Sequence, residues 1–296
     1  MKSKRHLLIA LERELARRIR GQEEALKRLV EIIVNRELES VPQRGPRGCF
    51  FFAGPTGVGK TETAKVLAEV LFGPGTIFRV DCSEYKTLAS LEGLLGNRAG
   101  DRGRLGQAYA RCPEGVWLWD EIEKAHPELV QLFLQMADEG QITLACGETL
   151  DLRNIYLIVT TNLGSAEILG KEHLTFTSLE RHVVHAIEQF LRPELLGRFG
   201  RPLVFHPLGR AVQADIAEQR LNDLLRWHHE RGRQIQPHPD VLPFLIHRGF
   251  SPRLGARPLV TFIEDRVGSA VSRELWADRD GSGRLVVNGE RLEIAQ

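Results

Sequence analysis

The sequence is poor in cysteine, and its few cysteines are scattered. None of the four forms a C-x-x-C pair, so neither a zinc ribbon nor a dithiol redox motif is indicated. They are Cys49, Cys82, Cys112 and Cys146. Long apolar runs are also missing, because no stretch approaches the ~18 residues of a transmembrane helix. We therefore expect reduced thiols in a protein with no membrane partner.

The chain also has almost no net charge. Its 40 Lys and Arg residues balance 39 Asp and Glu residues, so no overall field favours nucleic acid or an anionic membrane. The basic residues 1–5 precede only a short apolar run at 7–11, which is too short for a signal peptide. Glu12 and Glu14 argue against a transit peptide. The expected location is the cytoplasm.

The most informative stretch is residues 54–61, GPTGVGKT, which fits the phosphate-binding pattern G-x-x-x-x-G-K-[ST]. An apolar run at 49–53 predicts a buried strand before it, and 62–72 has helical spacing after it. Strand, loop and helix start together present backbone N–H groups to an anion. Lys60 would reach the β- and γ-phosphates, and the Thr61 hydroxyl would bind Mg²⁺. The residues assigned to cofactor binding here are Gly54, Pro55, Thr56, Gly57, Val58, Gly59, Lys60, Thr61 and Glu62.

Two further strands end in polar residues. The apolar run 116–119 precedes Asp120, which would hold Mg²⁺, and Glu121, which would activate the attacking water. The run 154–161 precedes Asn162, whose amide could bond the γ-phosphate or that water. Such residues also serve as helix caps and in turns. The phosphate-binding loop upstream favours the catalytic interpretation.

Strands and helices alternate through the first two thirds of the chain. Two helices over 6–36, broken at Gly21, come first. Further strands are predicted at 76–81, 116–119, 154–161 and 202–205, helices at 88–95, 127–139 and 178–191, and a glycine-rich polar loop at 97–104. This alternation predicts an α/β fold, with a parallel sheet flanked by helices on both faces.

Around Pro207 the pattern changes. Helices are predicted at 211–231, 239–248 and 255–275, followed by a polar turn at 278–283 and short strands at 285–287 and 292–294. We therefore predict two domains. Residues 1–207 would form the large α/β ATPase domain with its N-terminal helices, and residues 208–296 a small, mainly helical lid.

The motifs, in this order, resemble the Clp-type AAA+ chaperone ATPases, specifically their second ATPase module. Residues 54–61 match the Walker A motif and 120–127 the extended Walker B motif. Residues 81–85 match the segment leading to the central pore, and 161–165 carry sensor 1 at Asn162. The resemblance covers nearly the whole chain and implies an AAA+ fold, ATP hydrolysis, and remodelling of a protein client.

The resemblance implies roles for four more residues. Residues 18–22 look like the motif that packs on adenine, so Ile19 and Arg20 would bind nucleotide. Arg198 would be the arginine finger that serves a neighbouring subunit's ATP, and Arg257 would be sensor 2, which reports the γ-phosphate to the lid. The implied cofactors are ATP and Mg²⁺. The implied assembly is a nucleotide-dependent homo-oligomer, hexameric in this family.

Three departures from the family limit the resemblance. The sequence holds one ATPase module, whereas the full-length family members have a second one and an N-terminal substrate domain. The pore-loop stretch 96–103 is shortened and lacks an aromatic residue; its hydrated Asp101 and Arg102 suit charge-complementary contact with one client. Residues 165–192 show no apolar-Gly-apolar tripeptide for docking a ClpP-type peptidase. We therefore expect action on a specific protein partner.

Two alternatives remain open. The first is a nucleic-acid-associated AAA+ ATPase of the loader or mobile-element type, because Arg98, Arg102 and Arg104 would suit a phosphate backbone. The near-zero net charge and the missing aromatic stacking platform argue against it. The second is a subunit that binds nucleotide but needs a partner module to turn over.

Overall fold

The computed structural model describes residues 2–39, 45–98, 100–168, 175–191, 193–251 and 254–295. The chain divides into two compact units, one comprising residues 1–55 and 59–206 and the other residues 56–58 and 207–296. Within the described residues, no helix is long and apolar enough to cross a membrane.

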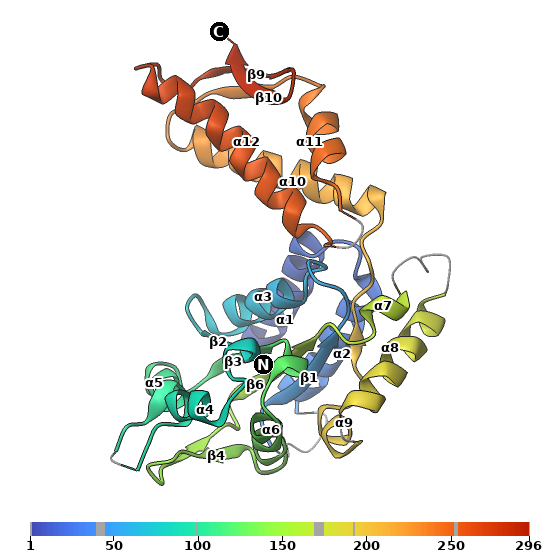
Figure 1. Ribbon diagram of the computed structural model, residues 1–296, viewed down its shortest axis with the longest axis vertical. Helices are drawn as coiled ribbons and strands as arrows, with labels where there is room; N and C mark the ends of the chain where they lie inside the picture. The colour runs from blue at the N-terminus through green and yellow to red at the C-terminus, as the bar shows by residue number, and fades with distance from the viewer. Residues whose placement is uncertain are drawn as a thin grey trace. The chain divides into compact units, whose positions relative to one another are not determined.

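The first unit is built on a parallel sheet of five strands in the order β2-β3-β6-β1-β7 (Figure 1). The strands are β1 (Gly48–Ala53), β2 (Ile77–Asp81), β3 (Gly115–Asp120), β6 (Ile155–Thr161) and β7 (Leu203–Val204). The register places Asp81 beside Asp120, and Ala53 beside both Thr161 and Val204. The carboxyl ends of the strands therefore meet at one edge, as the predicted parallel sheet requires.

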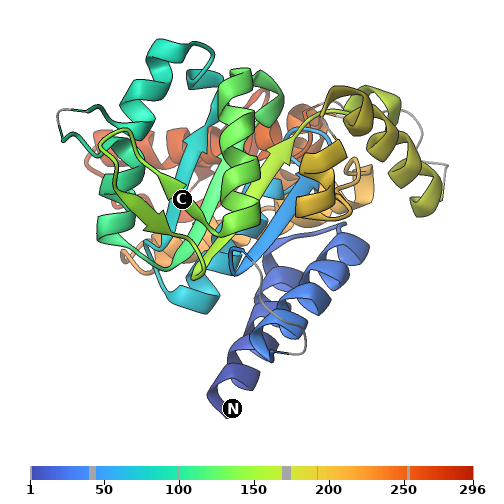
Figure 2. The same ribbon diagram turned by 90° about the horizontal axis from the view of Figure 1, so that it is seen from below.

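Helices cover both faces of this sheet. They are α1 (Lys2–Arg18), α2 (Glu23–Glu37), α3 (Lys60–Phe72), α4 (Leu88–Leu95), α5 (Gly103–Arg111), α6 (Pro127–Glu139), α7 (Ser165–Ile168), α8 (Phe176–Phe190) and α9 (Pro193–Phe199). Figure 2 shows α6 lying across one face, where the Trp119 and Phe133 rings pack 4.9 Å apart. Because strand side chains alternate between faces, Asp120 points to the opposite side, where Thr61 of α3 reaches it.

The region between β2 and β6 contains elements that the sequence did not reveal. The predicted loop 97–104 runs into α5, which begins at Gly103 and buries Leu105 and Ala108. A short antiparallel hairpin, β4 (Gln141–Thr143) with β5 (Thr149–Asp151), follows α6. A glycine at the start of the helix and strands of three residues give no clear periodicity, which is why both were missed.

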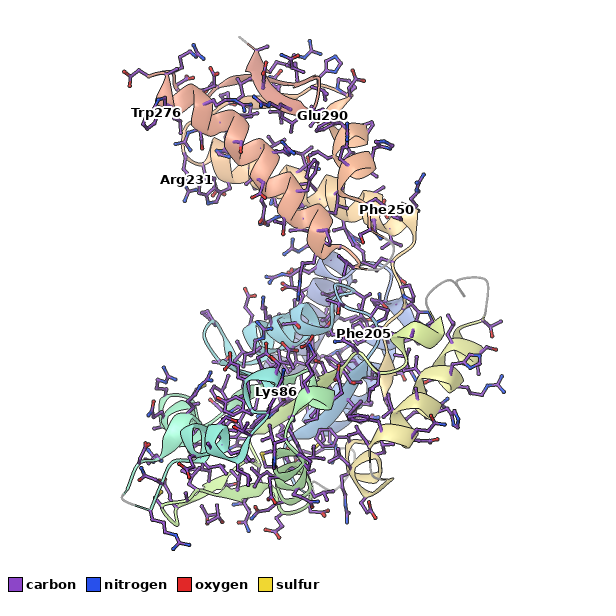
Figure 3. The ribbon with its side chains drawn as sticks, in the orientation of Figure 1. Lys86, Phe205, Arg231, Phe250, Trp276 and Glu290 are labelled. Carbon is purple, nitrogen blue, oxygen red and sulfur yellow. The ribbon has the colours of Figure 1, made fainter. Side chains whose placement is uncertain are left out.

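The second unit contains the three predicted helices and a small sheet. The helices are α10 (Arg210–His229), α11 (Val241–Gly249) and α12 (Arg257–Trp276), and the strands are β8 (Ile235–Pro237), β9 (Gly283–Asn288) and β10 (Arg291–Ala295). The predicted turn at 278–283 leads into β9, whereas Gly289 and Glu290 form the turn between β9 and β10. The unpredicted β8 pairs in parallel with β9. Trp276, at the end of α12, is 93% exposed (Figure 3).

Candidate nucleotide-binding site

The phosphate-binding loop leaves β1 through Gly54. Its N–H donates to the Thr161 carbonyl at 3.2 Å, and its φ is 139°. A Cβ on this residue would lie 2.3 Å from the Phe205 carbonyl oxygen, so neither the conformation nor the space admits a side chain. The loop is thereby fixed between the ends of β6 and β7, before Gly59 (φ 109°) caps the start of α3.

Lys60 points back into the loop. The Lys60 ammonium group is 2.5 Å from the Gly54 carbonyl oxygen and 2.7 Å from that of Pro55. It also donates to Asn162 Oδ1 at 3.0 Å, so it lies at the end of β6. The residue is only 7% exposed. A mobile ammonium held by weakly basic carbonyl oxygens inside a loop of N–H donors is well placed to exchange these partners for phosphate oxygens.

Thr61 and Asp120, the predicted magnesium ligands, lie together. The Thr61 hydroxyl is 3.2 Å from Asp120 Oδ1 and 3.4 Å from Oδ2. The Thr160 hydroxyl donates to Asp120 Oδ1 at 2.9 Å, and Arg79 Nε donates to Oδ2 at 2.6 Å. A hydroxyl beside a buried carboxylate offers the oxygen ligands that Mg²⁺ takes when it is held mainly by a nucleotide's phosphates and water. The donor set therefore fits this ion.

Glu121 is held through its backbone N–H and through both carboxylate oxygens. Its backbone is left-handed, with φ 59° and ψ 53°, a conformation that costs a non-glycine residue about 1–3 kcal/mol. Its N–H donates to the Thr160 hydroxyl at 3.1 Å. Its carboxylate accepts from Asn162 Nδ2 at 3.1 Å and from Lys124 Nζ at 2.5 Å. The hydrogen bond to Glu121 raises the pKa of Lys124, so this ammonium stays charged.

A second carboxylate fixes Asn162. Glu123 Oε1 accepts the Asn162 backbone N–H at 3.1 Å, and its Oε2 accepts the Thr161 hydroxyl at 2.8 Å. The Asn162 side chain consequently bridges Lys60 and Glu121 through its two different atoms, an acceptor oxygen toward the lysine and a donor nitrogen toward the glutamate. Three residues predicted from separate motifs thus form one connected cluster.

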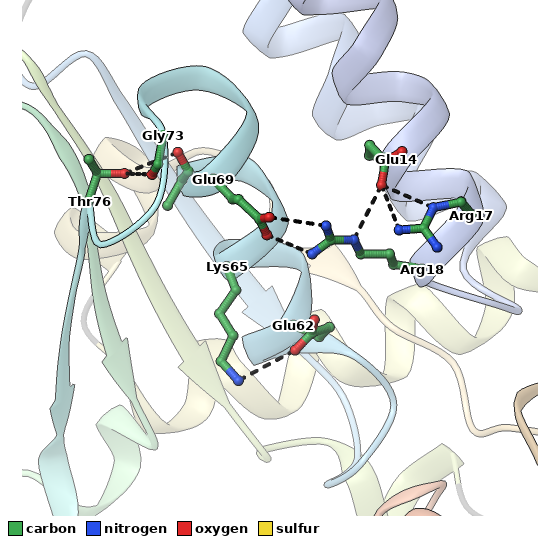
Figure 4. Close-up of polar contacts among 9 residues, drawn as sticks. Glu14, Arg17, Arg18, Glu62, Lys65, Glu69, Gly73 and Thr76 are labelled. Carbon is green, nitrogen blue, oxygen red and sulfur yellow. Dashed lines mark hydrogen bonds and ion pairs between the residues drawn. The ribbon is translucent and has the colours of Figure 1, made fainter. Parts of the chain in front are cut away.

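Ile19, one of the two residues predicted to contact adenine, lies beside the loop. Ile19 is 4% exposed, and a Cβ on Gly59 would lie 3.1 Å from Ile19 Cγ2. Arg18, at the end of α1, makes two hydrogen bonds to Glu69 of α3, at 2.7 and 3.2 Å (Figure 4). Arg20 is exposed. The same close-up shows Glu62, another predicted nucleotide contact, paired with Lys65 at 3.4 Å.

The arginines predicted as finger and sensor 2 lie on α9 and at the start of α12. The start of α12 adjoins the phosphate-binding loop, since a Cβ on Gly57 would lie 3.3 Å from the Arg257 backbone nitrogen. Arg198, on α9, pairs with Asp138 of α6 at 2.6 Å, and both side chains are partly exposed, at 55% and 37%. Arg257 is the first residue of α12 in the second unit. Both roles stay predictions. Arg192, which belongs to the predicted finger segment, lies outside the described residues. So do residues 169–174, which belong to the stretch 165–192 predicted to lack a peptidase-docking tripeptide.

Three charged residues in and beside the pore-loop stretch 96–103, namely Asp101, Arg102 and Arg104, are engaged within the chain. Arg102 makes a two-pronged contact with Glu148 of the hairpin, at 2.6 and 2.5 Å. Arg104 donates to Glu84 at 3.1 Å and to the Tyr85 hydroxyl at 2.5 Å. Asp101 accepts the Gly103 N–H at 3.0 Å. These side chains fasten the loop, so they are not simply displayed to a client or a phosphate backbone. Ala99 of this loop is outside the described part of the chain.

Arg79, Thr160 and Glu123 are the site residues that sequence reasoning missed. Arg79 and Thr160 are common residue types with no motif of their own, and Glu123 lies inside the Walker B stretch 120–127 without an expected role. The usable signal was register, because Asp81 pairs with Asp120, and β-strand alternation puts Arg79 on the same sheet face as Asp81. Predicting the strand pairs residue by residue would have placed Arg79 beside the acidic strand end.

Two family descriptions match the chain. Residues 45–201, more than half of the chain, match the AAA domain (Cdc48 subfamily), and residues 208–286 match the C-terminal, D2-small domain of ClpB protein. The two matches follow one another in the order expected from the sequence motifs.

Similar proteins agree with these matches. The chain is 36% identical to chaperone protein ClpB of Meiothermus ruber, in an alignment that covers 98% of this chain and 35% of that relative. It is 34% identical to chaperone protein ClpB 1 of Synechococcus elongatus, in an alignment that covers 99% of this chain and 35% of that relative. A cryo-electron-microscopy reconstruction of Hsp104 in a closed state, with ATPγS and FITC casein, superposes with a TM-score of 0.87 at 31% identity, covering 99% of this chain and 52% of that one. The chain spans about a third of the length of these curated relatives.

Proposed function

This chain belongs to the AAA domain family, here joined to a ClpB-type D2-small domain, and we propose that it binds ATP with Mg²⁺ and hydrolyses it. The observation that carries this proposal is the connected cluster of Lys60, Asn162 and Glu121. It brings the phosphate-binding cation within two hydrogen bonds of the carboxylate that would activate water. Such an arrangement has no evident use in a protein that only binds an anion.

Each residue of the cluster has a defined task. Lys60 would bind the β- and γ-phosphate oxygens, and Thr61 and Asp120 would hold Mg²⁺, which supplies positive charge to the phosphates. Glu121 would accept the proton of the attacking water, with its carboxylate oriented by Asn162. Thr160 fixes the two acidic residues relative to one another, since its one hydroxyl contacts both Asp120 and the Glu121 backbone.

We extend the proposal to a ring, hexameric as in related Clp-type ATPases, that remodels a protein client in the cytoplasm. Arg198 supports the ring, because a finger arginine completes a neighbour's site. It lies on α9 with its side chain 55% exposed, where another subunit can reach it. A protein client is supported by the ClpB relatives, which are named chaperones, and by the casein in the Hsp104 reconstruction.

The deciding experiment traps both nucleotide and client. Glu121→Gln should bind ATP while its turnover falls about 10²-fold, the scale of a lost general base. The trapped protein should then co-purify with its client. Glu92→Gln, on the exposed side of α4, serves as the matched control and should behave like the wild type. ATP hydrolysis by Glu121→Gln at the wild-type rate would refute the assignment of the water-activating residue.

A second experiment concerns the client class. None of the relatives described above is named for nucleic acid, and Arg102 and Arg104 are paired within the chain. We expect ATPase activity to be unaffected by DNA or RNA at both low and moderate salt. We also expect no unfolding of a stable fluorescent protein, with or without a ClpP-type peptidase, because the loop lacks an aromatic grip. Stimulation by nucleic acid that weakens with salt would favour the alternative function.

A further inference from the structure

The Asp120 carboxylate is a buried anion that has a cation partner from its own chain. Its side chain is 5% exposed, and Arg79 Nε lies 2.6 Å from Oδ2. The other groups that the structure places on this carboxylate, Thr61 and Thr160, are neutral hydroxyls. A buried charge is costly unless it is paired. Arg79 therefore supplies the compensating charge that Mg²⁺ would supply in the working site.

The two sides of this contact differ in burial. Asp120 ends β3 in the interior of the sheet and is fixed by Thr160, which is 2% exposed. Arg79 lies on the edge strand β2, and its side chain is 49% exposed. A half-exposed guanidinium can turn into water without losing much hydration energy, whereas the carboxylate cannot follow it. The contact is therefore able to open from the arginine side.

We propose that Arg79 is a positioning residue that occupies Asp120 in the metal-free protein and competes with Mg²⁺ for that carboxylate. This inference rests on the proposed function, because it takes Asp120 as a ligand of nucleotide-bound Mg²⁺. Arg79 keeps the acidic strand end folded and neutralised when the site is empty of metal. The same contact raises the Mg²⁺ concentration needed to fill the site.

A competing role and a merely structural role predict opposite changes in Mg²⁺ affinity when Arg79 is removed. If Arg79 only oriented Asp120 for the metal, its removal would weaken Mg²⁺ binding. If Arg79 competes, its removal takes away both the hydrogen bond that must be broken and the positive charge that repels the ion, and Mg²⁺ binding becomes tighter. Direction alone therefore separates the two roles.

The test is an Mg²⁺ titration of the binding of a fluorescent, slowly hydrolysed ATP analogue, which reports binding without turnover. Arg79→Met should lower the Mg²⁺ concentration at half-maximal binding about five-fold, the factor expected for a half-exposed ion pair. Analogue binding in EDTA should stay within about two-fold. Arg79→Lys, which keeps the charge but not the guanidinium geometry, should fall between the two. Arg153→Met is the matched control, because Arg153 pairs with Asp151 outside the site.

The metal-free form provides a second measurement. Arg79→Met should unfold at a lower temperature than wild type without metal, because Asp120 is left unpaired, and Mg²⁺ with the analogue should recover more stability in the variant than in wild type. An unchanged or higher Mg²⁺ requirement in Arg79→Met and Arg79→Lys would overturn the inference. If wild type itself fails to bind the analogue with Mg²⁺, the proposed function fails, and this inference fails with it.

Discussion

Two charged regions of the first unit use cationic and anionic side chains in opposite ways. At the nucleotide edge, where the parallel strands end, Lys60 and Asp120 are 7% and 4% exposed. In the outer loop region, which we define as residues 96–104 with the β4–β5 hairpin, Arg102 and Glu148 are 36% and 42% exposed. The first set joins α3, β3 and β6, whereas the second fastens a loop to a neighbouring hairpin.

This difference in burial indicates how much each ionic contact contributes to stability. An exposed pair is worth about 0–1 kcal/mol, since water screens it. Removing one partner of a buried pair costs about 3–5 kcal/mol, because the other charge is left unpaired in the interior. The buried charges of the nucleotide edge, Lys60 and Asp120, should therefore tolerate a change much less than the charges of the outer loop region do.

Arg198 is the residue that could break this comparison. Its pair with Asp138 is as exposed as those of the outer loop region, yet as a finger it would have the largest effect. Arg198→Ala should lower turnover about 10³-fold while leaving nucleotide binding intact, because an arginine finger contributes mainly to the transition state. Steady-state ATPase rates and nucleotide binding measure the two effects.

Subunit mixing gives the control for Arg198. A Lys60→Ala subunit can lend its arginine to the intact ATP site of an Arg198→Ala neighbour, so the mixture should regain part of the activity. Failure to regain any, under conditions where mixed rings are shown to form, would count against a finger acting between subunits.

Lys60 tests the comparison at the buried nucleotide edge. Lys60→Ala should weaken nucleotide binding roughly 10²-fold or more, because it removes a charge-assisted contact to two phosphates. Equilibrium binding of a fluorescent nucleotide measures this loss. Lys65→Ala, one turn along α3 and paired on the surface with Glu62, should bind as wild type does. Equal losses of nucleotide affinity in both variants would mean that burial does not decide which of the two lysines matters for binding.

Thr160 tests whether a neutral group at the buried edge matters as much as a charge. Thr160→Val removes the hydroxyl that Asp120 and the Glu121 N–H share, so unfolding should become easier by about 1–3 kcal/mol. Thr160→Ser keeps the hydroxyl and should lose much less. Chemical denaturation of both variants measures the difference, and similar losses would show that the methyl group, rather than the hydroxyl, is what the site requires.

The smallest effect is expected in the outer loop region. Arg102→Glu should cost less than about 1 kcal/mol of stability, and adding Glu148→Arg should restore part of it by re-forming the pair in reverse. ATPase activity should stay within about two-fold in both variants. A large loss of ATPase in the reversed pair would show that this region contributes to turnover.

The sequence predicted the parts of the molecule that are encoded locally. The glycine loop at 54–61, the acidic strand end at Asp120 and the amide at Asn162 each lie within one short motif, and the long helices have clear periodicity. Arg79 and Glu123 could not be predicted, because their importance depends on which strands pair and in which register. The strand β8 was missed for the same reason, since its partner β9 lies far along the chain.

The interior position of β1 in the sheet also constrains how the first unit can assemble. Ala53, at the end of this early strand, pairs with Thr161 on one side and Val204 on the other. The Gln22 side chain clasps the His206 backbone through two hydrogen bonds, at 2.8 and 3.0 Å. Contacts this distant in sequence close late, after large loop-closure entropies have been overcome. During synthesis, the aromatic strand of Phe50, Phe51 and Phe52 therefore has no partner on either edge until β6 has emerged, and its second edge stays unpaired until β7 has emerged, which exposes it to misfolding in the nascent chain.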